Sequence, residues 1–404
     1  MVHRAPSAFP AALLGSGRPL TLRGAGHSCD GQTVTDGELL VTYAPKAVAP
    51  QVRELGADLF EAPAGMSWYG LERYLNRRGR SFPVLPNHLH MSVGGTLSVG
   101  GIGIDSVRHG MQIDHVERIQ LIDGTGTSRW CSRTEHPELF RFALGGLGTV
   151  GLIERAVLRT VPYRRDTHLH RTCHTGLADL AEHTEEIARR DDVDVHWATM
   201  RRGRIFSVTG SRGHAPRRCD IDGCSVVSDL PFDGHPEPDH GPRHSDRGRM
   251  WSDYVVPAGK LAPMLGAVET LRQRPPLRHI PTMVYLLIVR RPHPGSSFAF
   301  APVGTSPVSI AVGVYTSVDR DPAAVAAVRA AFGELLRSCC ELGGRPYLYG
   351  VTDLEGAVAE HLYGPALDRL VELRRAHCVT HLNAHLPLVR AASARGRSDQ
   401  VGVP

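Results

Sequence analysis

The run Arg23-Gly24-Ala25-Gly26-His27-Ser28, with Gly31 and Gln32 close behind it, is the most informative stretch of the chain. Two more glycine-rich stretches follow, at 94–103 and 145–151. Glycine tolerates positive φ and lets a backbone approach a ligand closely, and consecutive N–H groups in such loops bind phosphate oxygens. For a single stretch, a tight hairpin turn is the preferred interpretation. Three of them within 151 residues would suit a long dinucleotide.

The surrounding pattern predicts a mixture of strands and helices. Short apolar runs bounded by glycine predict strands, and longer amphipathic runs predict helices at 49–55 and 68–77. The three glycine-rich stretches lack the Gly-Lys-Ser/Thr of a P-loop, and the first does not open a helix with the spacing G-x-G-x-x-G. A P-loop nucleotide site and a nicotinamide Rossmann site are therefore not supported.

Composition places the chain among ordinary globular proteins. It has 404 residues, 42% of them hydrophobic and 22% charged, and a length that suggests two or three domains. The formal net charge of +5 is diffuse, and no basic cluster is interleaved with aromatics, so we expect no nucleic-acid partner. No stretch approaches the apolar length of a spanning helix, so we expect a cytoplasmic protein without a membrane partner.

The cysteines and histidines do not predict a metal site. Eight cysteines are scattered along the chain, and free thiols are the expected state. Cys219 and Cys224 lie in a histidine-rich stretch, but their spacing fits no zinc pattern. A polar surface loop is the preferred interpretation of residues 210–249, and no metal ligand is assigned.

Taken in order, the motifs at 23–32, 93–112 and 139–153 resemble the FAD-binding (PCMH-type) domain of the vanillyl-alcohol-oxidase superfamily, and within it cytokinin dehydrogenases. Those enzymes read R-G-x-G-H-S-x-x-G-Q, V-G-G-T-L-S-N-A-G, R-H-G-P-Q and L-G-G-L-G-x-x-G-I-I in this order. A weaker similarity links Trp251-Ser252-Asp253-Tyr254-Val255-Val256 to the family's W-L-N-L-F-V-P strand. The resemblance is specific only within the first 163 residues.

The resemblance implies that the loops hold FAD. The implied cofactor-binding residues are Arg23, Gly24, Ala25, Gly26, His27, Ser28, Gln32, Gly94, Gly95, Thr96, Ser98, Gly148, Gly151 and Ile153. It also implies a covalent bond from His27 to the flavin 8α-methyl group, the alternative being a turn histidine that hydrogen-bonds its own loop. Berberine-bridge-type relatives carry a second link through a Cys before the second loop, which this chain lacks, so one bond is expected.

The same resemblance implies an α+β fold with two domains. Residues 1–163 would form the FAD-binding domain and 164–345 a substrate-binding cap on an antiparallel sheet, with 346–404 returning to the FAD domain. The FAD domain would be short at its amino end, because only 19 residues precede Leu20 where the family has a strand and a helix. A missing edge strand would leave backbone groups unpaired.

The chain departs from cytokinin dehydrogenases in its acid–base residues. The family carries a proton-accepting Asp shortly before its second glycine-rich loop, and Asn87 stands there in this chain. A second acidic position of the family falls on His196 in a loose alignment. We therefore take His196 first and Tyr254 second as candidate catalytic bases, with a half-buried strand histidine and a core tyrosine as the alternatives. Other candidates are Tyr285, Tyr347 and His385.

The predicted reaction is a two-electron oxidation by an FAD-dependent oxidase or dehydrogenase. A small-molecule alcohol or amine, in natural-product tailoring, would lose a hydride to FAD and a proton to a cap-domain base, with O2 or another acceptor taking up the electrons. Two alternatives stay open: a redox-neutral flavin-dependent cyclase, motivated by Asn87, and a non-catalytic flavin-fold protein, motivated by the short amino end and by Leu382-Asn383-Ala384-His385 in place of the family's S-P-G-Q.

Cytokinins should be poor substrates of this protein. An amide at Asn87 cannot take up the proton that the family's Asp accepts, so we expect no turnover of isopentenyladenine or zeatin at rates typical of cytokinin dehydrogenases. Steady-state assays with both compounds, beside an authentic cytokinin dehydrogenase, measure this. Rapid turnover of either compound would show that Asn87 is misaligned.

Overall fold

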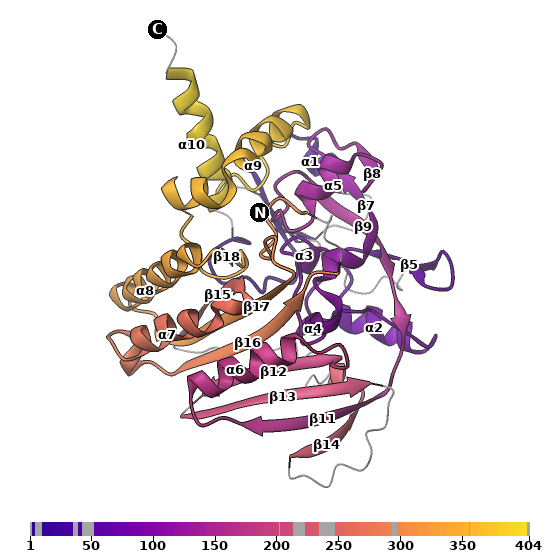
Figure 1. The fold of residues 1–404 in the computed structure, drawn as a ribbon. Helices are drawn as coiled ribbons and strands as arrows, with labels where there is room; N and C mark the ends of the chain where they lie inside the picture. Colours follow the sequence, from indigo (N-terminus) through magenta and orange to yellow (C-terminus); the bar gives the residue numbers. More distant parts are fainter. Residues whose placement is uncertain are drawn as a thin grey trace.

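A computed structural model describes residues 2–4, 10–34, 39–42, 52–201, 203–212, 223–233, 247–292, 297–354 and 356–401. Its helices and largely antiparallel sheets confirm the α+β class (Figure 1). The division into two domains at 163 and 345 stays a prediction. Buried apolar side chains nevertheless gather in two clusters, one around the glycine-rich loops and one under the largest sheet.

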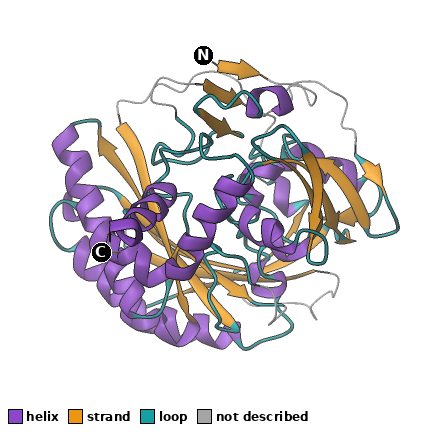
Figure 2. Cartoon of the chain, turned by 90° about the horizontal axis from the view of Figure 1, so that it is seen from above, coloured by secondary structure: helices purple, strands orange, loops and turns teal. Residues whose placement is uncertain are grey.

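The amino-terminal elements form a small parallel sheet at the edge of the molecule (Figure 2). Its strands lie in the order β1 (Val2–Arg4), β3 (Leu39–Thr42), β2 (Leu20–Arg23), and helix α1 (Pro10–Leu14) precedes β2. The expectation of a missing first strand is therefore wrong, because β1 precedes β2 in the chain and pairs with β3.

A five-stranded antiparallel sheet supports the second and third glycine-rich stretches. Its order is β4 (Arg53–Glu54), β5 (Leu59–Pro63), β9 (Leu152–Arg159), β7 (Val116–Ile122), β8 (Ser128–Ser132). The accompanying elements are α2 (Trp68–Asn76), β6 (Arg80–Ser81), α3 (Val93–Leu97), α4 (Ser106–His109), the 3-10 helix η1 (Gln112–His115), α5 (Pro137–Ala143) and β10 (Val161–Pro162), which pairs with β6. The helix predicted over 49–55 is wrong in its described part, because β4 pairs there with β5.

An eight-stranded antiparallel sheet dominates the middle of the chain. Its order is β14 (Cys224–Ser228), β11 (Asp166–Cys173), β13 (Arg204–Arg212), β12 (Val195–Arg201), β16 (Thr282–Arg290), β17 (Val308–Asp319), β15 (Arg247–Pro257), β18 (Arg345–Pro346). Helices α6 (Leu177–Ala188), α7 (Leu261–Arg272) and α8 (Pro322–Glu341) cover one face (Figure 1). Short 3-10 helices lie between strands: η2 (Leu230–Phe232), η3 (Ala258–Lys260) and η4 (Leu277–His279).

Strand periodicity gives the eight-stranded sheet two different faces. In β17, Ile310, Val312 and Val314 belong to the apolar cluster between the eight-stranded sheet and its helices, whereas Ala311 and Tyr315 line a cavity on the opposite side of the sheet.

Helix α8 begins where Asp321 accepts a hydrogen bond from the Ala324 N–H at 2.9 Å, directly before Pro322.

The carboxyl-terminal helices α9 (Gly356–Ala376) and α10 (Pro387–Val401) follow the eight-stranded sheet. The segment between them returns to β2, because the Leu20 N–H donates to the His381 carbonyl at 3.1 Å and the Asn383 N–H donates to the Leu20 carbonyl at 2.9 Å. Residues from both ends of the chain consequently share one buried cluster.

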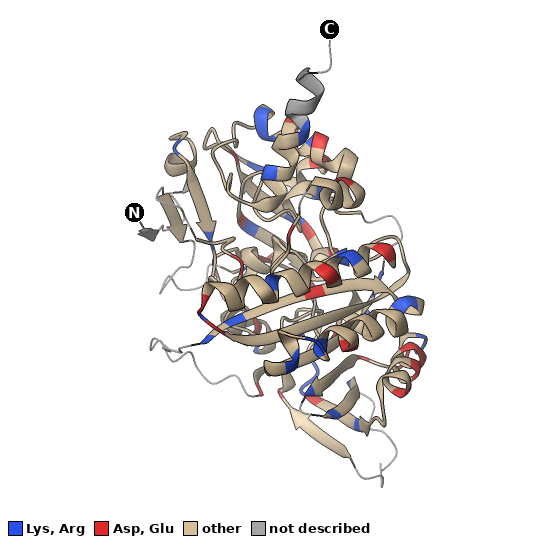
Figure 3. Ribbon diagram, turned by 90° about the vertical axis from the view of Figure 1, so that its left-hand side faces the viewer, with Lys and Arg blue, Asp and Glu red and all other residues tan. Residues whose placement is uncertain are grey.

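Lys and Arg are interspersed with Asp and Glu on the side drawn in Figure 3, which shows no single-sign face. None of the described helices is both long enough and apolar enough to cross a bilayer.

Six described cysteines are free, but the expectation of free thiols is wrong at Cys224, which is disulfide-bonded.

His196 should make the fold sensitive to acid. Burial, reinforced by His183 and His174, lowers the pKa of His196 from 6.5 to about 3. Below pH 6.5 the unfolded chain binds a proton that the folded chain does not, so the free energy of unfolding should fall by up to about 1.4 kcal/mol per pH unit. The substitution His196→Leu should remove this contribution in denaturant titrations between pH 7 and pH 4.

The exposed His279 provides the control. His279→Leu should keep the wild-type pH dependence of unfolding. Equal slopes for both variants would contradict the assignment to His196.

Candidate functional site

One cavity brings the three glycine-rich stretches together. All fourteen residues predicted to bind FAD line it, from Arg23 in the first stretch to Ile153 in the third. Ser92, Leu147, Tyr349 and Asn383 complete parts of its wall. The fold thus brings three stretches that are far apart in the sequence into the wall of one cavity.

Positive φ angles explain why glycine occupies two turns of this lining. Gly26 has φ +72°, and a Cβ there would collide with the Arg23 guanidinium. Gly148 has φ +65°, and a Cβ there would lie 3.2 Å from Nδ2 of Asn383. An L-residue at either position would be strained in its backbone and crowded by a polar group that lines the cavity.

An orphaned polar atom indicates that the cavity suits a polar ligand. Ser92 Oγ is buried in the lining and has no hydrogen-bond partner among the described residues. An unpaired buried hydroxyl is costly, and a ligand acceptor or donor would satisfy it. Together with the backbone of residues 24–28, which makes no backbone hydrogen bond among the described residues, Ser92 fits a ligand with phosphate and ribose oxygens, as FAD has.

A second cavity of about 540 Å³ adjoins the first. Both are lined by His27, Met91, Thr96, Val99 and Tyr349. Its wall is rich in aromatic side chains, which are Trp197, Trp251, Tyr285, Tyr315, Tyr347 and Tyr349. This size and lining are typical of small-molecule sites.

His27 lies at the junction of the two cavities. Its ring centroid is 5.0 Å from that of His88 and 5.9 Å from that of Trp251. Burial, and to a smaller extent the Arg249 guanidinium, lowers the pKa of His27 below its usual value of 6.5. The imidazole is therefore neutral at pH 7 and retains a nitrogen lone pair.

Asp253 is the most unusual group in the second cavity. Its side chain is buried, Oδ1 accepts a hydrogen bond from Tyr315 Oη at 3.2 Å, and Oδ2 has no partner among the described residues. Burial raises the pKa of Asp253 from 3.8 to about 6, against the opposing hydrogen bonds from Tyr349 and Tyr315. The two tyrosine hydroxyls lie 2.9 Å apart. This is a buried acid poised to titrate near neutral pH.

Gly313 makes room for this group. It pairs with Asp253 across β15 and β17, and with Tyr285 across β16 and β17. A Cβ at Gly313 would collide with Oδ1 of Asp253 and lie 2.6 Å from the ring of Tyr315. A glycine inside a central strand is explained here by close approach of side chains.

The two predicted bases lie on the other side of the sheet. His196 is fully buried beside His174 and His183, while its neighbour Trp197 lines the cavity. Tyr254 is fully buried, and its hydroxyl donates to the Phe332 carbonyl of α8 at 2.8 Å. Strand alternation directs both side chains toward the helices, so neither His196 nor Tyr254 lines the second cavity, where a base would meet a substrate.

Of the other candidate residues predicted from the sequence, some line the second cavity and one does not. Tyr285, Tyr347 and Asn87 line the second cavity, and Asn87 hydrogen-bonds the Tyr285 hydroxyl. His385 lines neither of the two cavities. The sequence interpretation missed Asp253. Asp253 lies two positions after Trp251 in one strand and so shares its face of the sheet, which was a usable signal.

Within the described ranges no group of three His, Cys, Asp or Glu side chains is arranged to hold a metal ion.

Comparison with known proteins agrees with this geometry. Residues 11–132 match the family described as FAD binding domain. The chain is 32% identical over 180 residues to cytokinin dehydrogenase 4 of Oryza sativa subsp. japonica, covering 43% of this chain and 34% of the relative. It is 40% identical over 138 residues to cytokinin dehydrogenase 4 of Arabidopsis thaliana, covering 33% of this chain and 26% of the relative.

A bacterial relative has a comparable match. The uncharacterized oxidoreductase ORF5 in the fasciation locus of Rhodococcoides fascians is 37% identical over 140 residues, covering 35% of this chain and 31% of the relative. The matched stretches thus span only about a third of the relatives' length.

A pair of glycine substitutions can test whether the first cavity holds FAD. Gly148 and Gly17 have nearly equal φ angles, +65° and +67°, but no atom lies within 4 Å of a Cβ built at Gly17. Alanine should cost about 1–2 kcal/mol of backbone strain at either site. Only Gly148→Ala should also lower bound FAD per chain, measured by flavin absorbance, because it displaces Asn383. Equal flavin content in both variants would contradict this site.

Proposed function

We propose that the chain is an FAD-dependent oxidase or dehydrogenase of a small-molecule alcohol or amine, and that its amino-terminal part, where residues 11–132 match the FAD binding domain family, holds the FAD. The observation that carries the proposal is the junction of the two cavities at His27. A cradle for a dinucleotide opens there into an aromatic-lined space of substrate size.

The residues of the first cavity would hold the FAD. The backbone N–H groups of residues 24–28 and of Gly95, which make no backbone hydrogen bond among the described residues, are suited to the pyrophosphate, and Gly148 and Gly151 to the adenosine half. His27 would form one covalent bond to the flavin, which its neutral imidazole and its place between the cavities support. When bound, FAD supplies a two-electron acceptor for a substrate hydride.

Asp253 would remove the accompanying proton. Its orphaned Oδ2 is positioned to accept a hydrogen bond and then the proton of the substrate O–H or N–H, while Tyr315 and Tyr349 hold the carboxylate in place. Asp253 belongs to the segment expected to form the cap, and it replaces His196 and Tyr254 as the proposed base. O2 or another acceptor would then take up the two electrons, and natural-product tailoring is a setting that suits such a reaction.

Asp253→Asn should abolish the proton transfer without harming the fold. Because burial raises the pKa of Asp253 to about 6, the ionised form destabilises the folded state at pH 8, and the amide variant should melt at an equal or higher temperature. In anaerobic stopped-flow mixing with substrate, the rate of flavin bleaching should fall about 10²–10⁴-fold. Wild-type bleaching should rise with pH through a midpoint at about pH 6 and level off about one pH unit above it.

Asp319→Asn is a suitable control, since Asp319 lies at the exposed end of β17 and forms an ion pair with Arg247 of β15. It should bleach at the wild-type rate. Product formation without bleaching would favour a redox-neutral cyclase, and a colourless wild-type protein would favour a non-catalytic flavin-fold protein. Either result would overturn the proposed function.

A further inference from the structure

The loop that carries His27 is not held by its own backbone. No backbone-to-backbone hydrogen bond reaches residues 24–30 in the part of the chain that the structure describes. The loop also contains one residue of positive φ, Gly26 at +72°, and is followed by another, Gly31 at +76°. Such a segment needs side-chain contacts to fix its position.

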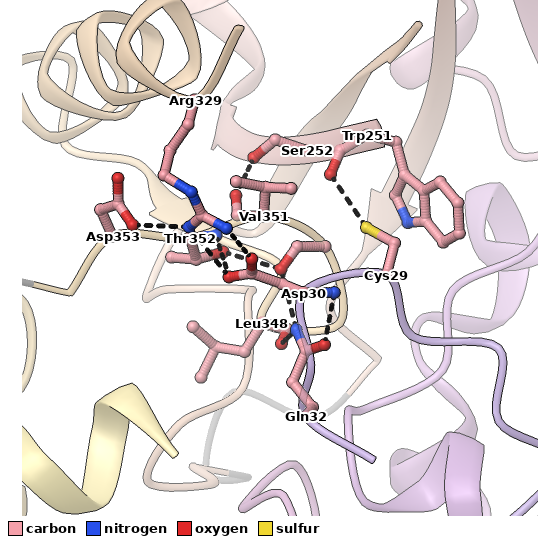
Figure 4. Close-up of polar contacts among 11 residues, drawn as sticks. Cys29, Asp30, Gln32, Trp251, Ser252, Arg329, Leu348, Val351, Thr352 and Asp353 are labelled. Carbon is pink, nitrogen blue, oxygen red and sulfur yellow. Dashed lines mark hydrogen bonds and ion pairs between the residues drawn. The ribbon is translucent and has the colours of Figure 1, made fainter. Parts of the chain in front are cut away.

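Those contacts come from residues far away in the sequence (Figure 4). The Asp30 N–H donates to Gln32 Oε1 at 2.8 Å, and Gln32 Nε2 donates to the carbonyls of Gly350 at 2.9 Å and Leu348 at 3.3 Å. Cys29 Sγ donates to the Trp251 carbonyl at 3.6 Å. These are neutral bonds of moderate strength.

The charged contact is the ion pair between Asp30 and Arg329 of α8. The Asp30 side chain is only 7% exposed, and Arg329 contacts both of its carboxylate oxygens. Arg329 also donates to Asp353 at 2.9 Å, and the Thr352 N–H approaches Asp30 Oδ2 at 3.5 Å. A two-pronged guanidinium contact to a largely buried carboxylate fixes direction as well as distance.

Helix α8 is a firm support for this contact. It spans Pro322–Glu341, and Val328 and Phe332, which flank Arg329, are buried in the cluster under the eight-stranded sheet. Because α8 packs on the eight-stranded sheet, the Arg329 guanidinium holds Asp30 at a fixed place relative to that sheet. His27 lies three residues before Asp30 in the same loop, so its position is restricted as well.

We propose that Arg329 is a positioning residue that, through Asp30, fixes the His27 loop for covalent attachment of FAD. This inference rests on the proposed function. In the attachment, the His27 nitrogen lone pair forms the N–C bond to the 8α carbon. The imidazole N–H proton and one 8α C–H proton leave to solvent, and the two electrons of the broken C–H bond pass by way of the FAD to the acceptor named above. Misplacement of a reacting atom by about 1 Å can slow such a step about 10²-fold.

The test compares covalent and total flavin in Arg329→Gln, Asp30→Asn and the double variant. Covalent flavin is the flavin that stays with the acid-precipitated chain, sampled at fixed times after expression begins, and total flavin is read by absorbance. We expect covalent incorporation to slow about tenfold to a hundredfold in both single variants, with total flavin near wild type. Asp30→Asn should melt near the wild-type temperature, because Arg329 keeps its bond to Asp353, whereas Arg329→Gln should melt lower, because it leaves the largely buried Asp30 carboxylate without its cation. The double variant should be no slower than either single variant, because both break one contact.

Two controls make the outcome decisive. Arg274→Ala removes another ion pair of α8, with Glu334 at 3.1 Å, and should keep wild-type incorporation. Arg329→Lys should restore part of the rate. Wild-type incorporation in Arg329→Gln, additive losses in the double variant, or a parallel fall of total flavin and stability would each overturn the inference while leaving the proposed function intact. Acid-stable flavin in His27→Ala, or none in the wild type, would overturn the covalent link itself.

Discussion

The hydrogen bonds of the Asn383 side chain join the parts of the chain on which the site depends. Its Oδ1 accepts from the Leu22 N–H at 2.8 Å, and its Nδ2 donates to the carbonyls of Leu147 at 3.1 Å and Gly148 at 3.2 Å. One amide that is 2% exposed thus ties the strand before the first glycine-rich loop to the third loop. An amide with donors and acceptors on one planar group is well suited to this task.

In the second cavity the main feature is an unfavourable one, the burial of the Asp253 carboxylate. Burying Asp253 without a cation raises the free energy of its charged form, and two tyrosine hydroxyls offset only part of that cost. Proteins concentrate such unfavourable groups where a ligand or a reaction uses them. Gly313, which weakens a central strand, belongs to the same arrangement, because it exists to accommodate Asp253 and Tyr315.

The sequence predicted the first cavity far better than the second. Glycine motifs are local signals, so residues 23–28, 94–98 and 148–153 could be assigned before any contact was known. The bases could not, since a residue type does not reveal which face of a sheet it occupies. Tyr254 and Trp251 differ by an odd number of positions in one strand and therefore point to opposite faces, whereas Asp253 shares the face of Trp251. The contacts of Asp30 with α8 and of Asn383 with β2 join residues about 300 or more positions apart, beyond the reach of local patterns.

The return of the segment at 347–386 to the amino-terminal loops has a consequence for biosynthesis. A ribosome releases the glycine-rich loops long before it makes Tyr349 and Asn383, which complete their cavity. Until then the backbone groups of Leu22, Leu147 and Gly148 lack the hydrogen bonds that the Asn383 side chain makes to them. A cavity with all of its wall residues therefore exists only after translation has passed residue 383, and no shorter nascent chain offers FAD the full set of contacts.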